Sequence, residues 1–335
     1  MRLLALVAAF TVLAVAPRPG EAQSSPYAGK TITIGVGYKP GGGYDSAARI
    51  LARHLPKHVP GKPTVIVQNM PGANSIIAAN HVYNVAKPDG MTLGTFNRNL
   101  PIGQLLKVDG VKFDMLKFAW IGSAASESTV LAIRSDLPYK TFEEMRKSGK
   151  QIVVGATGPG ANTYDFPLLM KEFLGVNFKI VSGYSSSADI MLAIERKEVD
   201  ARAGSYSSMR PFIDRKLVHP VIRARAAEPG IEKLPMDENL AATPRAKAIM
   251  ALRSAPEVVG RPYVMPPGTP DALVKIMRDA FAKTIQDKEL VTEAGKAKMD
   301  LNFVSGDEAI KVMKEVLTQP KDIVDEFGKY VKFGE

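Results

Sequence analysis

The sequence contains no cysteine, and this absence excludes disulfide bonds, thiolate catalysis and cysteine-ligated metal sites. It has only four histidines, His54, His58, His81 and His219. His54 and His58 are four residues apart, as in a zinc-binding helix, but the Leu-Pro-Lys between them supplies no glutamate base, and no third ligand is evident. We therefore predict that this pair marks a partly exposed helix end and that the protein has no metal site and no cofactor.

Catalytic motifs are also missing from the sequence. No Gly-x-Ser-x-Gly elbow and no calcium-binding loop occur, and the adjacent Glu143 and Glu144 point in different directions on a predicted helix. Catalysis needs a positioned acid, base, nucleophile or metal. The sequence thus favours a protein that binds a ligand and is not an enzyme.

Long apolar runs are scarce. Leu3–Ala16 is apolar over fourteen residues, fewer than the roughly 20 that span a bilayer, and it follows a positively charged start. Small-residue cleavage sites follow at Ala16 and Ala22, as is typical of an export signal. Pro17 disfavours the first site, so we predict a signal peptide over residues 1–22. Because the exported chain has no disulfide, we expect it in the periplasm. A buried N-terminal helix is the alternative.

The composition is basic without any concentrated basic segment. Lysine and arginine number 44 against 34 acidic residues, which gives a formal net charge of +10. A positive surface attracts anions. The basic residues are spread along the chain and form no tract interleaved with aromatic residues, so we expect no nucleic-acid partner. Only the net charge supports a polyanion binder. Four arginines could each meet a carboxylate in a cleft, but we expect each of them at the surface: Arg98, Arg134, Arg202 and Arg210.

Strand and helix patterns alternate along the chain, which is typical of an α/β fold with parallel sheets. The first half predicts strands at Thr31–Val36, Thr64–Gln68 and Met91–Thr95, with helices at Ser46–His58 and Ser75–Val85. The second half predicts strands at Val130–Arg134, Gln151–Ala156, Phe178–Val181, Ala201–Gly204 and Val218–Ala224, with helices at Asn162–Leu174 and Ala188–Lys197. Capping signals at Thr141, Thr269 and Ser305 mark further helix starts. Three closing helices, at Ala272–Gln286, Ala309–Leu317 and Ile323–Val331, are expected to return to the first half and cover it.

Glycine-rich loops follow predicted strands in both halves. Tyr38–Ser46 contains three consecutive glycines before a helix, where backbone N–H groups and the helix dipole favour a carboxylate or phosphate. Pro40 occupies the third glycine position of a dinucleotide fingerprint, and no Gly-Lys-Ser/Thr ends the loop, so neither nucleotide motif fits. Asn69–Ser75 and Ala156–Thr163 repeat the design, while Tyr184–Ser187 adds hydroxyl groups. A tight turn in which Asp45 only caps the helix is the alternative for the first loop.

The same segments resemble a known family. Pro40-Gly41-Gly42-Gly43-Tyr44-Asp45, Val67–Ala73 and Lys87–Leu93 resemble the receptors of tripartite tricarboxylate transporters (TctC or Bug-type binding proteins). The likeness continues through Glu198–Asp200 and Pro266–Pro270 and covers nearly the whole mature chain. It implies a type II periplasmic binding protein with two α/β lobes and a ligand cleft between them. We assign residues 23–124 and 225–335 to the first lobe and residues 125–224 to the second.

The resemblance also implies a ligand site. By position it would include Tyr38, Gly42, Gly43, Tyr44, Asn74 and Asn97 of the first lobe, and Ser126, Thr157, Gly160, Ala161, Asn162, Thr163, Tyr184 and Ser205 of the second. Many relatives have a Gly-Ser-rich run, ending in a small residue and often histidine, where this chain has the loop Thr157–Thr163. We expect Tyr44, Asn162, Thr163 and Tyr184 to influence which acid is accepted.

The implied ligand is a di- or tricarboxylate, an aromatic acid or an amino acid, held largely by backbone amides and waters. The implied partners are a small and a large membrane subunit of a tripartite tricarboxylate transporter. No heptad pattern or large apolar strip suggests association, so we expect a monomer. A ligand-binding partner of a membrane sensor and an exported enzyme acting on a carboxylate are the alternatives.

Overall fold

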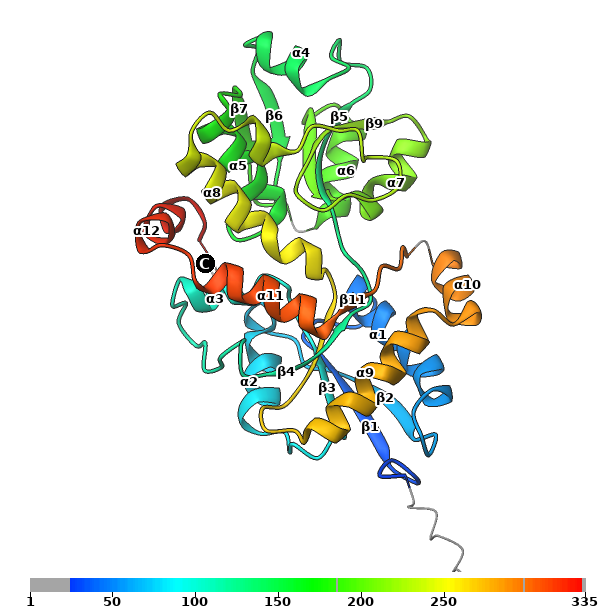
Figure 1. Ribbon diagram of the computed structural model, residues 1–335. Coiled ribbons are helices and arrows are strands. Elements are labelled where there is room, and N and C mark those ends of the chain that lie inside the picture. The colour runs from blue at the N-terminus through cyan, green and yellow to red at the C-terminus, as the bar shows by residue number, and fades with distance from the viewer. Residues whose placement is uncertain (1–24, 185, 298, 333–335) are drawn as a thin grey trace, which may run out of the picture.

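The computed structural model describes residues 25–184, 186–297 and 299–332. The predicted signal peptide, residues 1–22, lies outside the described residues. The chain forms two β-sheets, each with helices on its faces, and the two sheets lie at opposite ends of the molecule (Figure 1). We call the six-stranded sheet with its helices the first lobe and the five-stranded sheet with its helices the second lobe. None of the helices in the described ranges combines the length and the hydrophobicity of a membrane span.

The first sheet has the strand order β11-β4-β10-β3-β1-β2. Its strands are β1 Thr31–Val36, β2 Thr64–Asn69, β3 Thr92–Thr95, β4 Ala119–Ser123, β10 Pro262–Met265 and β11 Val304–Ser305. β1 runs parallel to β2 and β3, which confirms the predicted βαβαβ unit. β10 is antiparallel to both β3 and β4, so the sheet is mixed and not fully parallel. β4, β10 and β11 were not predicted from the sequence.

Helices cover both faces of this sheet. They are α1 Gly43–His54, η1 Leu55–Lys57, η2 Ala73–Ser75, α2 Ile76–Asn84, α3 Leu100–Leu105, α9 Asp271–Ile285, α10 Lys288–Lys296 and α11 Gly306–Leu317. The predicted capping box at Ser305 is confirmed, because its hydroxyl accepts from the N–H of Glu308 and the Glu308 carboxylate accepts from the N–H of Ser305. The predicted cap at Thr269 is wrong: its hydroxyl donates to Pro266 O, and Pro270 takes the cap position.

The second sheet has the strand order β7-β6-β8-β5-β9. Its strands are β5 Thr129–Arg134, β6 Ile152–Gly155, β7 Phe178–Val181, β8 Ala201–Ser205 and β9 Val218–Arg223. β6 is parallel to β7 and β8, whereas β5 is antiparallel to β8 and β9. The helices of this lobe are α4 Phe142–Lys147, α5 Asn162–Leu174, α6 Ser187–Glu195 and α7 Tyr206–Asp214.

The remaining helices lie where the lobes meet. They are η3 Asp237–Leu240, α8 Pro244–Ser254, η4 Ala255–Val259 and α12 Lys321–Tyr330. α12 packs against α8 and α5, and the rings of Tyr330 and Phe173 are 5.2 Å apart. The last helix therefore reaches the second lobe, whereas α9 and α11 cover the first sheet as expected. Met250 of α8 enters the core of the second sheet, so the lobe boundary at residue 225 stays a prediction.

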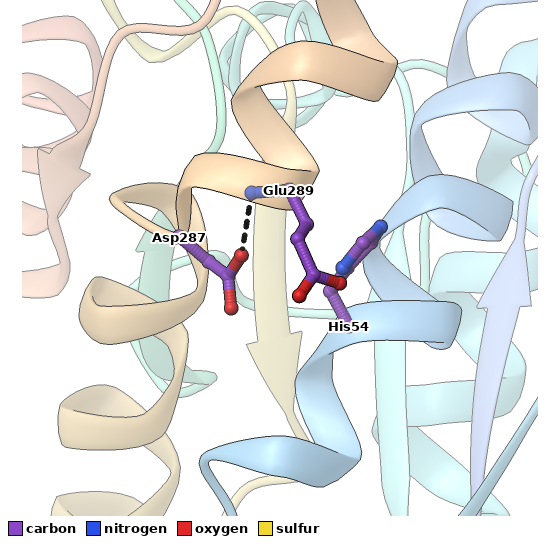
Figure 2. Close-up of side chains that lie close together, drawn as sticks. All are labelled: His54, Asp287 and Glu289. Carbon is purple, nitrogen blue, oxygen red and sulfur yellow. Dashed lines mark hydrogen bonds between the residues drawn. The ribbon is translucent and has the colours of Figure 1, made fainter.

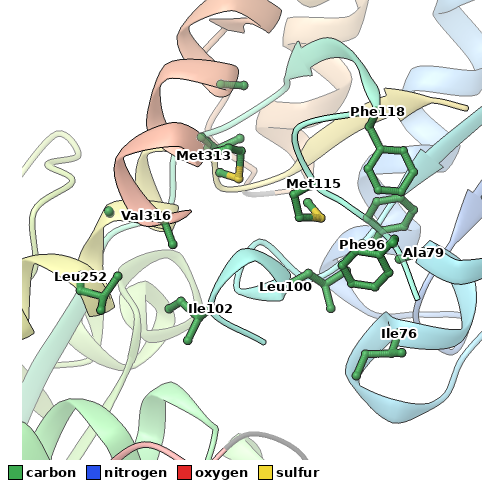
Figure 3. Packing of buried hydrophobic residues seen from close by; sticks show 14 of the residues in the cluster. Ile76, Ala79, Phe96, Leu100, Ile102, Met115, Phe118, Leu252, Met313 and Val316 are labelled. Atoms are coloured by element: carbon green, nitrogen blue, oxygen red, sulfur yellow. The ribbon is translucent and has the colours of Figure 1, made fainter. Parts of the chain in front are cut away.

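A single apolar cluster joins the elements around this junction (Figure 3). It collects buried side chains from α2, α3, α8 and α11 and from the segments before β4 and after β3, including Ile76, Leu100, Leu252, Met313, Phe118 and Phe96. Trp120 is buried in the same cluster and donates from Nε1 to Met115 O at 2.8 Å. Burial of this apolar surface, at about 25 cal/mol per Å², favours one arrangement of α8 and α11 on the first sheet.

Candidate functional site

A cleft of about 530 Å³ lies between the lobes. The carboxyl ends of β1, β2 and β3 lead into it from one side, and those of β6, β7 and β8 lead into it from the other. Its first-lobe wall consists of Tyr38, Tyr44, Asn74, Asn97, Arg98 and Asn99, and Glu127 comes from the segment between β4 and β5. Its second-lobe wall consists of Thr157, Gly158, Pro159, Gly160, Ala161, Asn162, Thr163, Ser187, Arg202, Gly204, Ser205 and Ser208. Loops at the carboxyl ends of parallel strands are the usual ligand site of such sheets.

Two tyrosines form the aromatic part of the first-lobe wall. The rings of Tyr38 and Tyr44 stack with their centroids 4.8 Å apart. The hydroxyl of Tyr44 donates to Gly260 O at 3.0 Å and accepts from the N–H of Arg98 at 3.1 Å. Tyr44 thereby ties the loop after β1 to the loop after β3 and to the segment before β10.

Ser75 joins the loops of the first-lobe wall. It is fully buried, and its hydroxyl donates to Gly37 O at 3.0 Å and accepts from the N–H of Asn97 at 3.2 Å. Ala73, Asn74 and Ser75 all have positive φ, an unusual run for residues other than glycine. This strained turn places Asn74 at the cleft.

In each of the two glycine loops, one backbone N–H group donates to an aspartate a few residues further along the chain. The N–H of Gly41 donates to Asp45 Oδ2 at 2.9 Å, and the N–H of Gly160 donates to Asp165 Oδ1 at 3.0 Å. Hydrogen bonding from Arg49 is the main reason that the pKa of Asp45 falls to about 2, whereas burial raises the pKa of Asp165 to about 7. One amide in each loop is thus already satisfied, which weakens the sequence argument that these loops alone attract an anion.

Asp45 does not occupy the cap position that the sequence suggested. Gly42 is the N-cap of α1, and Asp45 is the third residue of the helix. There its carboxylate also accepts from Asn69 Nδ2 at 2.8 Å and pairs with Arg49 at 2.9 Å. It fixes the loop to β2 and makes no contribution to the cleft wall.

The loop after β6 forms the facing wall. The N–H of Thr157 donates to Thr163 Oγ1 at 3.0 Å, and the two threonine hydroxyls are 2.8 Å apart. Asn162 Nδ2 donates to Thr129 Oγ1 at 3.1 Å. These bonds hold the first turn of α5 with its N-terminus at the cleft, where the helix dipole favours a negative group.

Two of the four arginines expected at the surface are buried in the cleft wall, so that expectation is wrong for them. Arg98 is 8% exposed and Arg202 is 3% exposed. The other two line no part of the cleft: Arg134 pairs with Asp136 and Asp200, and Arg210 pairs with Asp300.

Glu127 is the acidic group of the cleft. Its carboxylate binds Arg98 and, at 2.7 Å, Arg261. Burial favours protonation, but the charges of Arg98 and Arg261 outweigh it and hold the pKa of Glu127 below its usual range. Glu127 therefore stays ionised. It links the segment between β4 and β5 to Arg98, which follows β3, and to Arg261, which precedes β10.

Ten of the fourteen residues expected at the ligand site line the cleft: Tyr38, Tyr44, Asn74, Asn97, Thr157, Gly160, Ala161, Asn162, Thr163 and Ser205. Gly42 and Gly43 line an adjoining cavity of about 640 Å³ that also touches Tyr38, Tyr44 and Asn74. Ser126 accepts from Asn302 Nδ2 at 2.9 Å, and Tyr184 packs on the second-lobe core, and neither lines the cleft.

Sequence reasoning missed several residues of the cleft wall. Glu127, Asn99, Gly204 and Ser208 were not predicted as contacts. Gly158, Pro159 and Ser187 lie in loops that the sequence indicated, Ala156–Thr163 and Tyr184–Ser187, but were not among the residues assigned to the ligand site. Gly204 ends a predicted strand and Ser208 follows it within one helical turn, and this position was the signal that could have found them.

His54 and His58 lie outside the cleft. Figure 2 shows His54 against the start of α10. His54 is buried and its Nε2 is 2.7 Å from Glu293, while Nε2 of His58 is 2.9 Å from Asp287. The ligand atoms of His54, Asp287 and Glu289 lie within 4.8 Å of one another. Lys57 Nζ bonds both His54 Nδ1 and Glu289, however, and a cation there opposes a metal ion. The group acts as an ionic link between η1 and α10, and His54 is more buried than the sequence suggested.

Known proteins share the two-lobed fold. The model of the tripartite tricarboxylate transporter family receptor matches residues 47–329. The UPF0065 protein in the gbd 5'region of Cupriavidus necator is 25% identical over 334 residues, which cover 96% of this chain and 95% of that protein. A TctC solute binding protein from Polaromonas superposes with a TM-score of 0.72 at 22% identity, covering 89% of this chain and 98% of its own. MatC from Rhodopseudomonas palustris, with bound malate, superposes with a TM-score of 0.61 at 19% identity, covering 88% and 99%. At such identities the structures show the two-lobed fold, while the family match spans most of the chain, and the protein therefore belongs to the receptor family of the tripartite tricarboxylate transporters.

Proposed function

We propose that this protein is a periplasmic receptor that binds a small organic carboxylate and delivers it to a tripartite tricarboxylate transporter. The observation that carries the proposal is the cleft between the lobes, into which three parallel strands of each sheet lead their carboxyl ends. A ligand held by both walls stabilises the state in which the lobes are close together, because only that state offers it both sets of contacts. Binding can thereby be signalled to a partner by lobe closure.

The charge of the cleft supports an anionic ligand. Its ionisable wall residues besides the tyrosines are Arg98, Arg202 and Glu127, which leave a positive balance. The amide side chains of Asn74, Asn97 and Asn162 and the hydroxyls of the loop after β6 add neutral hydrogen-bonding groups. The malate bound by MatC, a protein of the same fold, is a carboxylate of the proposed class.

The chemistry of the wall supports binding without turnover. Glu127 is held ionised between two arginines, so it is neither a proton donor nor a free base. The hydroxyls of Thr157 and Thr163 bond each other, and no histidine is found among the described residues of the wall.

The proposal is tested by measuring the melting temperature of residues 23–335 with malate, succinate, adipate, citrate, benzoate and glutamate. A ligand at 100 times its Kd stabilises a protein by about 2.7 kcal/mol, which such a scan detects. We expect at least one acid to stabilise the protein and to be recovered unchanged after long incubation. Stabilisation by heparin or DNA alone would contradict the proposal, and conversion of the acid would show an enzyme.

The transport role needs a separate test. We propose that the receptor works as a monomer and that its partners are the small and large membrane subunits of such a transporter. Uptake of the stabilising acid should be lost in cells that lack the receptor and restored by the wild-type gene. Unchanged uptake, with a changed transcriptional response to the acid, would instead support a membrane sensor as the partner.

A further inference from the structure

Arg202 has an unusual place in the second lobe. It lies on β8, the central strand of the five-stranded sheet, between Gly155 of β6 and Ala132 of β5. It is 3% exposed and still lines the cleft. An arginine in the middle of a sheet is expected only where something fixes its guanidinium group.

The neighbouring residues direct this guanidinium toward the carboxyl end of β8. Its Nη2 donates to Ser208 Oγ at 3.0 Å, and Ser208 in turn donates to Ser205 O at 2.8 Å. A Cβ atom on Gly204 would lie 2.9 Å from Nη2 and 3.4 Å from Nε, so the glycine leaves the space that the guanidinium occupies. Gly204, Ser205 and Ser208 all line the cleft, and the charge therefore lies at the cleft wall.

No carboxylate among the described residues lies within 4.0 Å of Arg202, and its Nε has no hydrogen-bond partner there. The other buried arginines differ, because Arg98 and Arg261 share Glu127, and Arg253 pairs with Glu257 at 2.9 Å. Burial without an opposite charge lowers the pKa of Arg202 to about 10, so the group is still cationic at neutral pH. A buried cation without a counter-charge is costly in a folded protein unless a partner supplies one.

A second unneutralised charge lies at the base of the cleft. Glu127 supplies one negative charge to the two positive charges of Arg98 and Arg261. Nε of Arg98 and both Nε and Nη1 of Arg261 are buried without a partner among the described residues. We call Glu127, Arg98 and Arg261 the Glu127 cluster. This cluster and Arg202 together have two more positive charges than negative charges.

We propose that Arg202 binds one carboxylate of the ligand and that the receptor selects acids with two anionic groups, the second of which is attracted by the Glu127 cluster. The inference rests on the proposed function and adds the ligand class to it. Arg202 and a carboxylate can form two parallel hydrogen bonds, which a neutral amide cannot replace. The adjoining Ser208 and Ser205 then position the bound group.

Calorimetric titration of the wild-type protein with matched ligands tests the inference. Succinate, malate and adipate are compared with their half-amides, in which one carboxylate becomes a neutral carboxamide of similar shape. We expect the preferred diacid to bind at least about 30-fold more tightly than its half-amide, because truncating one side of a buried charge pair is strongly unfavourable. In Arg202→Met the diacid should lose about 100-fold in affinity, and its preference over the half-amide should collapse to a few-fold.

Two variants separate binding from structure. Arg134→Met removes an arginine from the adjacent strand β5 that already has acidic partners, and its ligand affinities should stay within about 3-fold of the wild type. Arg202→Met without ligand should melt at or above the wild-type temperature, because it removes an uncompensated buried charge. A residue with only a structural role would give the opposite result, a lower melting temperature.

Three results would overturn the inference. One is equal binding of diacid and half-amide by the wild type, and another is a diacid affinity of Arg202→Met within 3-fold of the wild type; both leave the proposed function intact. The third is a wild-type protein that binds no acid of the panel, in which case the proposed function fails and the inference fails with it.

Discussion

Gly260 lies directly against the carbonyl of Ala125, so that a Cβ atom on Gly260 would be 2.4 Å from Ala125 O. The contact joins the two segments that connect the sheets. The N–H of Arg261 donates to Ala125 O at 3.3 Å, and the N–H of Glu127 donates to Glu257 O at 3.1 Å. Any hinge motion between the lobes has to bend these paired segments.

Gly260→Ala should disturb this crossing. The atoms that a methyl group would meet belong to the backbone of Ala125 and Glu127 and cannot move aside as a side-chain end could. We expect a loss of about 2–3 kcal/mol in the free energy of unfolding, measured by urea denaturation. Gly295→Ala is the control, because no described atom outside its own helix backbone and chain neighbours lies within 4 Å of the added methyl group, and a helix gains up to about 1 kcal/mol from alanine. Equal changes in the free energy of unfolding in Gly260→Ala and Gly295→Ala would contradict a tight backbone contact at Gly260.

Glu127→Gln should destabilise the protein more than any exposed acidic substitution. It leaves Arg98 and Arg261 as buried cations without a carboxylate, and breaking a buried pair in this way costs about 3–5 kcal/mol. Glu143→Gln on α4 removes only exposed, solvent-screened ion pairs and should change stability far less. Urea denaturation of both variants at neutral pH compares them. If Glu127→Gln loses no more stability than Glu143→Gln, the Glu127 cluster contributes little to the stability of the folded protein.

Ser75→Ala should weaken both stability and ligand binding. It removes the hydroxyl that links Gly37 O and the N–H of Asn97, and buried polar groups left without a partner cost about 1–3 kcal/mol. Because that hydroxyl fixes the loops that carry Tyr38 and Asn97 to the cleft, affinity for the stabilising acid should fall as well. Ser148→Ala is the control, because it also removes a hydroxyl that bonds two backbone groups, Met145 O and the N–H of Lys150, but at an exposed helix end where water can replace it. It should change stability clearly less and leave affinity unchanged. An unaltered affinity in Ser75→Ala would show that this loop contact does not influence ligand binding.

The sequence predicted those elements whose boundaries are set by local signals. The bounds of α5 and β7 agree with the predictions, because glycine loops flank them and their apolar periodicity is clear. β10 was missed because its four residues acquire their partners only through pairing with β3 and β4, each well over a hundred residues away. Periodicity cannot report such a contact.

The candidate site divides in the same way. The glycine loops after strands were recognisable from spacing, whereas the individual residues, such as Asn74, Asn97 and Asn162, were assigned from the family resemblance, and these three line the cleft. The burial of Arg98 and Arg202 was not recognisable, because it depends on distant parts of the chain: Glu127 pairs with Arg98, and β5 and β6 enclose the strand of Arg202. A charged residue in a sequence is expected at the surface unless a partner is known.

The pH dependence of stability follows from three buried carboxyl groups. Burial raises the pKa of Asp165, Glu228 and Asp237 to about 7 in each case. In the unfolded chain such groups titrate near pH 4, so between about pH 4 and pH 7 the folded state binds more protons than the unfolded state. Their contribution to stability is therefore fully present below about pH 4 and is lost as pH rises through about 7.

Asp237→Asn tests this sign at one site. Asp237 is fully buried, and neither carboxylate oxygen has a hydrogen-bond partner among the described residues. Asparagine keeps the shape and never ionises, so at pH 8 the variant should be more stable than the wild type by about 1–3 kcal/mol, and at pH 5 the gain should be clearly smaller. Urea denaturation of both proteins at the two pH values gives the difference, and groups that titrate equally in both cancel.

The opposite case provides the control for Asp237. Hydrogen bonding from His58 is the main cause that lowers the pKa of Asp287 to about 2, so this carboxylate stabilises the folded state when ionised. Its stabilisation is present above the unfolded pKa near 4 and is lost as pH falls toward 2. Asp287→Asn should therefore lower stability at both pH 8 and pH 5, whereas Asp237→Asn should raise it. If both variants shift stability in the same direction at pH 8, burial does not hold Asp237 in the unfavourable charged state, and the explanation for the pH dependence is wrong.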